Sequence, residues 1–227
     1  MIRDYLHSIT PTWGTRHIDG TLAGCPDAAL SLAVALHPED RGELIVALFG
    51  AKIPVPAFKA ALRSVWQNNH WRLMEAVFNN IQDEPRGPLS ARFVAHGRLR
   101  EMFSYADFSE TWQHLPDRFT VYRGTYGVDF EEACGGLSWT LDYDLACWFA
   151  VEYSQRYCEN PDQIRVIQCE VIKDEDHIWL FTNEREEQEV VIEIPYADER
   201  AEEVGDLSEW KARANICSDR MREARLA

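Results

Sequence analysis

The sequence predicts an α+β protein, with a mostly helical region over residues 1–112 followed by a strand-rich domain over residues 113–227. The spacing of apolar residues predicts this division. In the first half they recur every three or four positions, as in amphipathic helices, whereas later they form short β-branched runs and alternating stretches. The spacing changes within residues 105–117, where we place the boundary. The chain has 227 residues, of which 46% are apolar, and is long enough to bury a sizeable core.

The first half is predicted to be a series of helices after an irregular start. Residues 1–24 contain many turn formers and are expected to be an ordered but irregular lead-in. From Asp27 the pattern becomes helical, with Leu30 and Val34 on one face, and Pro38 ends the segment. Further helices are predicted over residues 43–49, 58–67, 71–81 and 93–103, with a break at Asn68-Asn69.

The second half is predicted to alternate short strands with two helices. Asp142 is a suitable N-cap for a helix in which Leu145, Trp148 and Phe149 share one face. A C-terminal helix is expected around Trp210 and Ile216. Strands are predicted over residues 119–123, 137–140, 165–172, 178–181 and 190–194, a turn over 124–127 and a charged loop over 182–187.

The charge of the chain disfavours some classes of partner. There are 38 acidic and 23 basic residues, which gives a net charge of −15. Because proteins that bind nucleic acid without sequence preference present basic surfaces, bulk nucleic-acid binding is not expected, and a protein target with a basic surface is favoured. No run of 18 apolar residues occurs, so no membrane association is expected. The N-terminus lacks the apolar core of a signal peptide, and a cytoplasmic location, or delivery into a host cytosol, is expected.

The six cysteines do not follow the spacing of a metal site. No Cys-x-x-Cys pair occurs, and the histidines are scattered without a His-x-x-x-His pair. We therefore expect buried thiols in a reducing compartment and no bound metal.

Three short motifs in the second half carry candidate chemistry. The two carboxylates of the third motif are two positions apart and directly precede an apolar β-branched run, so strand alternation would place them on one face. A carboxylate pair can stabilise a developing positive charge and transfer a proton within one site. The motifs are, in chain order, Val121-Tyr122-Arg123-Gly124, Leu137-Ser138-Trp139-Thr140 and Glu187-Gln188-Glu189.

Over residues 117–195 this ordered set resembles the mono-ADP-ribosyltransferase superfamily of the arginine, Ser-x-Thr, Glu-x-Glu type. That family has an arginine at the end of a first strand, a Ser-Thr-Ser strand and a glutamate pair before a later strand. Here Trp139 fills the middle of the Ser-Thr-Ser motif and Thr140 replaces its last serine, while the first hydroxyl is kept. The resemblance implies a mixed β-sandwich catalytic domain, NAD as co-substrate and transfer of ADP-ribose to a protein side chain. Because this chain has Glu-x-Glu and not Gln-x-Glu, it resembles the members of the family that modify arginine.

The resemblance also implies roles for four residues. Glu189 would stabilise the oxocarbenium-like ribose that forms when the bond to nicotinamide breaks. Glu187 would bind the acceptor and help to deprotonate it, and a carboxylate suits a cationic guanidinium acceptor. Arg123 would pair with the phosphate or ribose of NAD. Ser138 would hydrogen-bond Glu189 and hold its rotamer.

Five further residues are candidates for ligand contacts. Gly124 would let the backbone approach NAD without a Cβ. Tyr122, Thr140 and Phe149 are placed at the NAD site, where an aromatic ring can stack on the nicotinamide. Phe181 precedes the glutamate loop and would touch the acceptor. For the aromatic residues, burial in the core is the competing interpretation.

Two other functions stay open at this point. The same site with water as the acceptor would make the protein an NAD glycohydrolase. A degenerate domain that uses its helices to hold a partner would make it a non-catalytic binding module. A second Glu-x-Glu, at residues 184–186, competes with the pair at residues 187–189. We prefer the later pair because it directly precedes the apolar strand.

Overall fold

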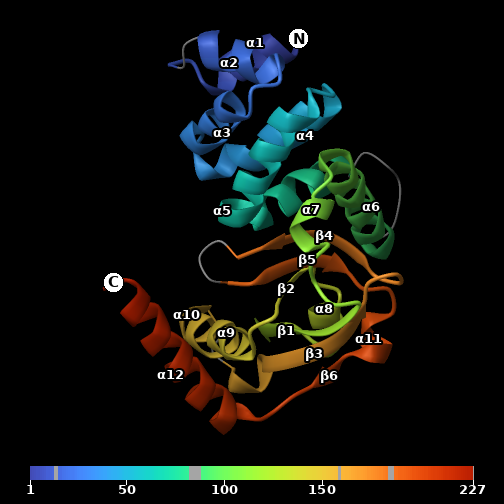
Figure 1. Cartoon of the computed structure of the whole chain (residues 1–227), viewed down its shortest axis with the longest axis vertical. Helices are drawn as coiled ribbons and strands as arrows, with labels where there is room; N and C mark the ends of the chain where they lie inside the picture. The colour runs from blue at the N-terminus through green and yellow to red at the C-terminus, as the bar shows by residue number, and fades with distance from the viewer. Residues whose placement is uncertain (13–14, 82–87, 158–159, 184–186, 227) are drawn as a thin grey trace. The chain divides into compact units, whose positions relative to one another are not determined.

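The structure, a computed structural model, describes residues 1–12, 15–81, 88–157, 160–183 and 187–226. The chain divides into two compact units, Met1–Phe108 and Ser109–Ala227 (Figure 1). The described part of the first unit contains helices alone, and every described strand belongs to the second unit. The predicted α+β class with a helical N-terminal region is therefore confirmed. The boundary between the units falls within residues 105–117, where the apolar spacing changes.

The first unit is a set of helices around an apolar and aromatic core. Phe49 and Phe58 are almost completely buried, and their ring centroids lie 5.6 Å apart. Helix α5 bends at Asn69, whose φ of −153° and ψ of 37° are not helical, so the predicted break at Asn68-Asn69 is confirmed. The helices are α1 (Ile2–Ile9), α2 (Thr15–Leu22), α3 (Pro26–Ala35), η1 (Pro38–Asp40), α4 (Arg41–Gly50), α5 (Val55–Ile81) and α6 (Pro88–Ala106).

One expectation for the first unit is wrong. Most of the described residues among 1–24 form α1 and α2 instead of an irregular lead-in, because each short helix buries an apolar side chain, Leu6 in α1 and Ile18 in α2. In α3, Leu30 and Val34 share an exposed face, and Ala28, Ala29, Leu32 and Ala33 face the core. Since α3 is apolar on every side, the spacing of its apolar residues does not select the buried face.

The elements of the second unit largely follow the predicted order. Asp142 caps its helix as predicted, since its carboxylate accepts a hydrogen bond from the Leu145 backbone N–H. The predicted turn over 124–127 is wrong, because β1 continues to Tyr126 and the left-handed φ occurs at Gly127. The elements are α7 (Ser109–Trp112), β1 (Arg118–Tyr126), α8 (Phe130–Cys134), β2 (Ser138–Thr140), α9 (Tyr143–Trp148), the π-helical turn η2 (Phe149–Tyr153), α10 (Ser154–Tyr157), η3 (Pro161–Gln163), β3 (Ile164–Ile172), β4 (His177–Thr182), β5 (Glu189–Glu193), α11 (Ala197–Arg200), β6 (Glu202–Glu203) and α12 (Leu207–Ala224).

The described strands form one antiparallel sheet in the order β4-β5-β2-β1-β3-β6. The expected mixed β-sandwich is therefore corrected to a single antiparallel sheet. This sheet consists of two three-stranded halves, β4-β5-β2 and β1-β3-β6, which are joined at the residue pair Tyr122↔Thr140. By contrast, β1 and β3 are paired along their full length, from Arg118↔Ile172 to Tyr126↔Ile164. The sheet is thus continuous, but β1 and β2 diverge at its centre.

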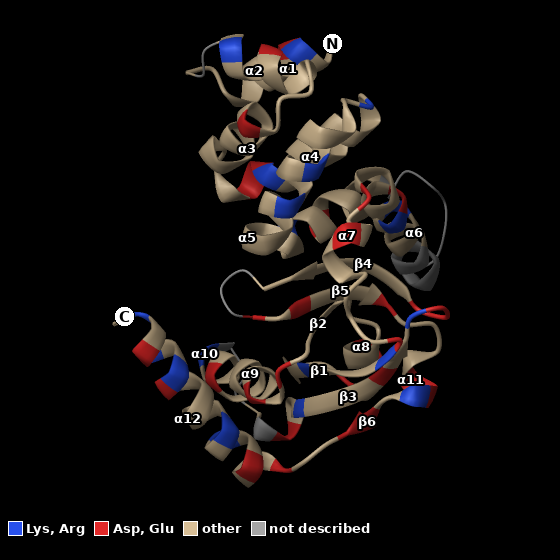
Figure 2. Cartoon of the chain, viewed as in Figure 1, with Lys and Arg blue, Asp and Glu red and all other residues tan. Residues whose placement is uncertain are grey.

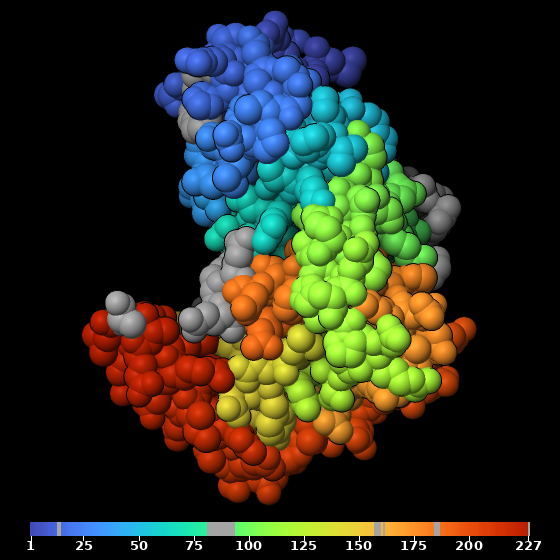
Figure 3. Space-filling model, in the orientation of Figure 1, coloured from blue at the N-terminus to red at the C-terminus, as the bar shows by residue number. Residues whose placement is uncertain are grey.

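Helices cover both faces of this sheet. Val121, Trp139 and Val190 pack on one face together with residues of α8 and α11. On the other face α9, η2 and α12 pack together, and α12 is anchored by the buried Trp210. Figure 3 shows α12 at the surface beside the segment that contains α9. The C-terminal helix expected around Trp210 and Ile216 is present as α12, in which Ile216 is exposed.

An ion pair between the buried Asp176 and Arg200 stabilises the turn between β3 and β4. The side chain of Asp176 is 0% exposed and accepts two hydrogen bonds from the Arg200 guanidinium, at 2.6 and 2.9 Å. The same carboxylate accepts from the Ile172 backbone N–H at 2.7 Å, and Arg200 also donates to the Glu170 carbonyl oxygen at 2.6 Å. These contacts connect α11 to the end of β3 and raise the pKa of Arg200 through its hydrogen bonds to Asp176.

The net negative charge of the chain comes from the second unit. That unit has 27 acidic and 12 basic residues, whereas the first unit has 11 of each. Acidic side chains are spread over its helices and over β6 (Figure 2). Among the helices of the described residues, none combines the length and the apolar character that crossing a bilayer requires.

Candidate functional site

The candidate site lies where β1 and β2 diverge. Arg123 directly follows the bridging residue Tyr122, and its Nη1 donates a hydrogen bond to the carbonyl oxygen of Ser138 on β2. The guanidinium therefore links the two strands beyond their single bridge. Because the Arg123 side chain is partly buried, its charge is held at this position by the protein.

A glycine that sequence analysis did not select makes room for this arginine. A Cβ at Gly136 would overlap Cζ and Nε of Arg123, so the guanidinium lies directly against the glycine backbone. Trp139 Nε1 donates to the Gly136 carbonyl oxygen at 2.8 Å and fixes that backbone segment. The Gly135-Gly136 pair before β2 could have indicated a close contact at this point. Its partner Arg123 is 13 residues away along the chain, so the sequence does not show which residue makes that contact.

The Glu189 carboxylate is held by Ser138. Ser138 Oγ donates to Glu189 Oε1 at 2.6 Å, a distance typical of a charge-assisted hydrogen bond. Glu189 is 8% exposed and begins β5, where it pairs with Thr140 of β2 and Thr182 of β4. Three strands thus fix the backbone of this residue, and the hydroxyl fixes its side chain. Arg123 and Glu189 thus both contact Ser138, Arg123 at its carbonyl oxygen and Glu189 at its hydroxyl.

Glu187 is not part of the same strand. β5 begins at Glu189, and Gln188 has a left-handed φ of 44°, so the prediction that strand alternation places both carboxylates on one face is wrong. The partly buried Glu187 is held through its backbone instead, since its carbonyl oxygen accepts from Thr140 Oγ1 at 2.7 Å. The competing Glu-x-Glu at residues 184–186 lies outside the described residues.

Thr140 and Gly124 position protein elements. Thr140 Oγ1 donates to the Glu187 carbonyl oxygen and accepts from the Asp142 N–H at 3.0 Å, so this hydroxyl bridges two segments of the protein. A contact of Thr140 with NAD stays a prediction. A Cβ at Gly124 would overlap the Ala146 carbonyl oxygen and lie 2.8 Å from the Ala150 nitrogen. The absence of a side chain therefore lets α9 and η2 pack on β1, which corrects the expected role of Gly124 in ligand approach.

Phe149 lies beside this close contact. It begins η2, directly before Ala150, and its ring centroid lies 5.3 Å from that of Trp148 and 5.9 Å from that of Tyr153. Trp148, Phe149 and Tyr153 thus form an aromatic cluster on the helical turn above Gly124. A π-helical turn often marks a functional position, which keeps Phe149 a candidate for ligand stacking.

The other two aromatic candidates pack within the protein. Tyr122 lies against Tyr143, with ring centroids 5.2 Å apart, in the cluster between β1, α9 and α12. Phe181 pairs with Val190, and Thr182 pairs with Glu189, so Phe181 lies on the opposite face of the sheet from Glu189. There Phe181 packs on the core and on His114, and the centroids of the two rings lie 5.3 Å apart. The expected contact of Phe181 with the acceptor is corrected to core packing.

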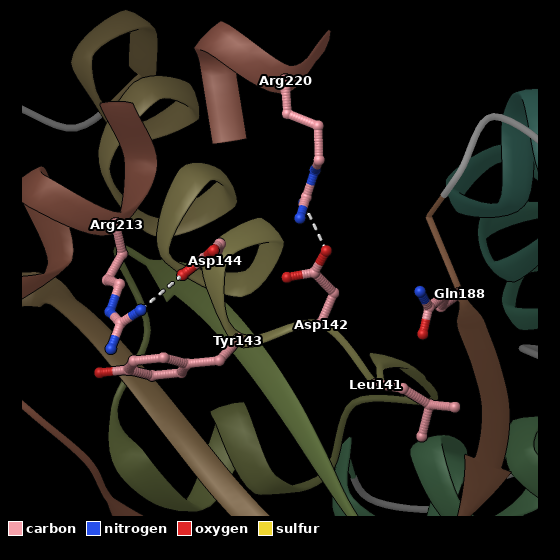
Figure 4. Close-up of a pocket in the computed structure, with 7 residues that line it drawn as sticks. All are labelled: Leu141, Asp142, Tyr143, Asp144, Gln188, Arg213 and Arg220. Carbon is pink, nitrogen blue, oxygen red and sulfur yellow. Dashed lines mark hydrogen bonds and ion pairs between the residues drawn. The ribbon is translucent and has the colours of Figure 1, made fainter. Parts of the chain in front are cut away.

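A pocket beside the site was not predicted from the sequence. Its volume is about 410 Å³, and Figure 4 shows residues of α12, of the start of α9 and of the segment before β5 around it. Arg220 pairs with Asp142, and Arg213 pairs with Asp144 at 3.4 Å. The partners are 78 and 69 residues apart in the sequence, so no local pattern indicates the pocket. The lining residues are Leu141, Asp142, Tyr143, Asp144, Gln188, Arg213 and Arg220.

Four cysteines of the second unit are buried. Burial raises the pKa of Cys134, Cys169 and Cys217, and that of Cys147 to about 12, so these four cysteines stay protonated thiols. Among the described residues, no group of three or more His, Cys, Asp or Glu side chains is arranged to hold a metal ion.

Comparisons of the chain with protein-family models, curated proteins and solved structures found no match. A functional conclusion for this chain therefore depends on the chemistry of its own residues.

Proposed function

We propose that the protein is a mono-ADP-ribosyltransferase that transfers ADP-ribose from NAD to a protein side chain, with arginine as the acceptor. The contacts of Arg123 and of Glu189 with Ser138, beside the divergence of β1 and β2, carry this proposal. A fixed guanidinium and a fixed, largely buried carboxylate lie on the two sides of Ser138, one bound to its carbonyl oxygen and one to its hydroxyl. This arrangement suits a substrate that carries phosphate groups and develops positive charge at a sugar carbon.

The residues fit the requirements of NAD cleavage. Arg123 would bind a phosphate or ribose oxygen of NAD, for which its planar fork is suited. Glu189 would stabilise the positive charge that develops on the ribose as nicotinamide leaves, and Ser138 would keep its carboxylate in place. In the overall reaction the ribose–nicotinamide bond breaks, a bond from the ribose carbon to the acceptor nitrogen forms, and the acceptor loses a proton.

The charge of the second unit favours a cationic acceptor. Its excess of acidic residues would attract a basic target surface over several ångströms and increase the rate of encounter. Glu187, placed by Thr140 next to the site, would bind the guanidinium and take up its proton. Docking of the target on the helical first unit stays a prediction.

Replacing Glu187 by glutamine is expected to lower transfer to arginine about 10²-fold, because the acceptor loses its proton-accepting partner. Nicotinamide release with water as the acceptor should persist within about tenfold, since it depends on Glu189. The measurement is the ratio of ADP-ribosylated agmatine to free ADP-ribose in the wild type and the variant. An unchanged ratio would show that Glu187 does not handle the acceptor.

Replacing Gly136 by alanine is expected to displace the Arg123 guanidinium, because the new Cβ would overlap it. The atoms that must move are the end of a flexible side chain, so the fold should keep its melting temperature. The affinity for NAD should fall about tenfold, which corresponds to one charge-assisted contact. Calorimetric titration with NAD checks this, with Arg123→Ala as the reference for complete loss of the contact. Wild-type affinity in Gly136→Ala would contradict the role of this glycine.

The products formed from NAD test the function itself. The protein is incubated with NAD and a cell lysate, and the products are identified by mass spectrometry. ADP-ribose attached to protein arginine supports the transferase. Free ADP-ribose alone would assign an NAD glycohydrolase, and intact NAD with a folded protein would assign a binding module.

A further inference from the structure

We propose that the pocket between α9, α12 and Gln188 is a guanidinium-binding subsite, with Asp142 as its anchor and Arg220 as an occupant supplied by the chain itself. In Figure 4 the Arg220 side chain extends from α12 to the Asp142 carboxylate. The structure therefore contains a guanidinium bound to a carboxylate in a pocket large enough for a small ligand.

The two partners differ in a way that suits exchange. The Asp142 side chain is 12% exposed, and its other carboxylate oxygen accepts from the Leu145 N–H at 3.1 Å. Its position is thus fixed by the start of α9. The Arg220 side chain is 46% exposed, so it can swing into solvent while α12 stays in place. A rigid buried acceptor and an exposed donor form a site that another guanidinium can enter.

Hydrogen bonds connect this subsite to the candidate active site. The Asp142 N–H donates to Thr140 Oγ1 at 3.0 Å, and Thr140 Oγ1 donates to the Glu187 carbonyl oxygen at 2.7 Å. Gln188, between Glu187 and Glu189, lines the pocket. A guanidinium on Asp142 would thus be bound next to the segment that carries the predicted acceptor carboxylate. The role of the subsite in holding the acceptor rests on the proposed function, whereas guanidinium binding does not.

Arg213 provides an internal comparison. It lines the same pocket, but it pairs with Asp144 and lies 3.9 Å from Glu209, with its guanidinium 5.7 Å from the centre of the Tyr143 ring. Burial raises the pKa of Tyr143, which keeps it protonated, and its hydroxyl donates to Glu209 at 3.3 Å. Arg213 is therefore held by Asp144 and Tyr143 of α9 and by Glu209 of α12. Arg220 is held by Asp142, next to Thr140, and by a weak contact with Cys217 Sγ at 3.7 Å.

The test measures binding of agmatine, a small guanidinium compound, in the absence of NAD. Arg220→Ala should bind agmatine about tenfold more tightly than the wild type, because the tethered competitor is removed. Adding Asp142→Asn to Arg220→Ala should abolish this gain, while the asparagine still caps α9. If that double variant does not fold, Asp142→Ser takes the place of Asp142→Asn, because serine also caps helices. Arg213→Ala should leave the affinity near that of the wild type.

The outcomes separate this inference from the proposed function. No gain in the folded Arg220→Ala variant, or an equal gain in Arg213→Ala, would overturn the subsite. A gain in agmatine affinity that depends on Asp142 supports the subsite even if no variant cleaves NAD. Absence of NAD cleavage would reject only the proposed transferase. If NAD is cleaved and the gain is absent, the transferase stands and the subsite fails.

Discussion

Replacing Glu189 by glutamine is expected to lower nicotinamide release from NAD by at least about 10²-fold, with either arginine or water as the acceptor. The substitution removes the negative charge that stabilises the developing positive charge on the ribose. It keeps an oxygen that can accept the Ser138 hydrogen bond, so the melting temperature should change little. Chromatographic measurement of nicotinamide release, together with thermal melts, checks both expectations.

Glu193 is a matched control for this variant. It lies on the same strand, four residues further on and on the same face, at the opposite end of β5 from Glu189. Glu193→Gln makes the same chemical change and should keep the wild-type rate. Wild-type turnover in Glu189→Gln, or an equal loss in Glu193→Gln, would remove Glu189 from the catalytic role.

The largest expected effect on stability comes from Asp176. Asp176→Ala leaves the Arg200 guanidinium and the Ile172 N–H without their buried carboxylate partner. Breaking such a pair from one side costs about 3 kcal/mol in the free energy of unfolding. Urea denaturation followed by circular dichroism measures the loss. In a double-mutant cycle with Arg200→Ala the two losses should be far from additive, because the residues act as one unit.

The pair of Arg118 and Glu170 is the control for this effect. Both side chains are exposed and 3.3 Å apart, so Arg118→Ala should cost less than about 1 kcal/mol. Equal costs for Asp176→Ala and Arg118→Ala would show that burial of the Asp176–Arg200 pair does not determine its contribution.

Local patterns in the sequence predict much of this molecule. Alternation and β-branched runs locate β3 and β5 to within one or two residues, and the Asp142 cap locates the start of α9. The three strands that carry Arg123, Ser138 and Glu189 are each recognisable locally. The contact of Ser138 with Glu189 was an expectation from the family resemblance, and the structure contains that hydrogen bond.

The remaining features depend on which distant segments meet. The face on which Phe181 lies follows from its register with Val190, and the roles of Thr140 and Gly124 follow from their contacts with Glu187 and Ala146. Single-sequence periodicity carries no information on such pairings. The left-handed φ of Gln188 likewise interrupts the alternation that predicted a shared face for the two glutamates.

The most direct test of the central claim is a crystal structure of the protein with a non-hydrolysable NAD analogue. The proposal predicts that the nicotinamide ribose lies within hydrogen-bonding distance of the Glu189 carboxylate, with a phosphate or ribose oxygen on Arg123. An analogue bound elsewhere, or no binding at millimolar concentration by the folded protein, would contradict the assignment of this site.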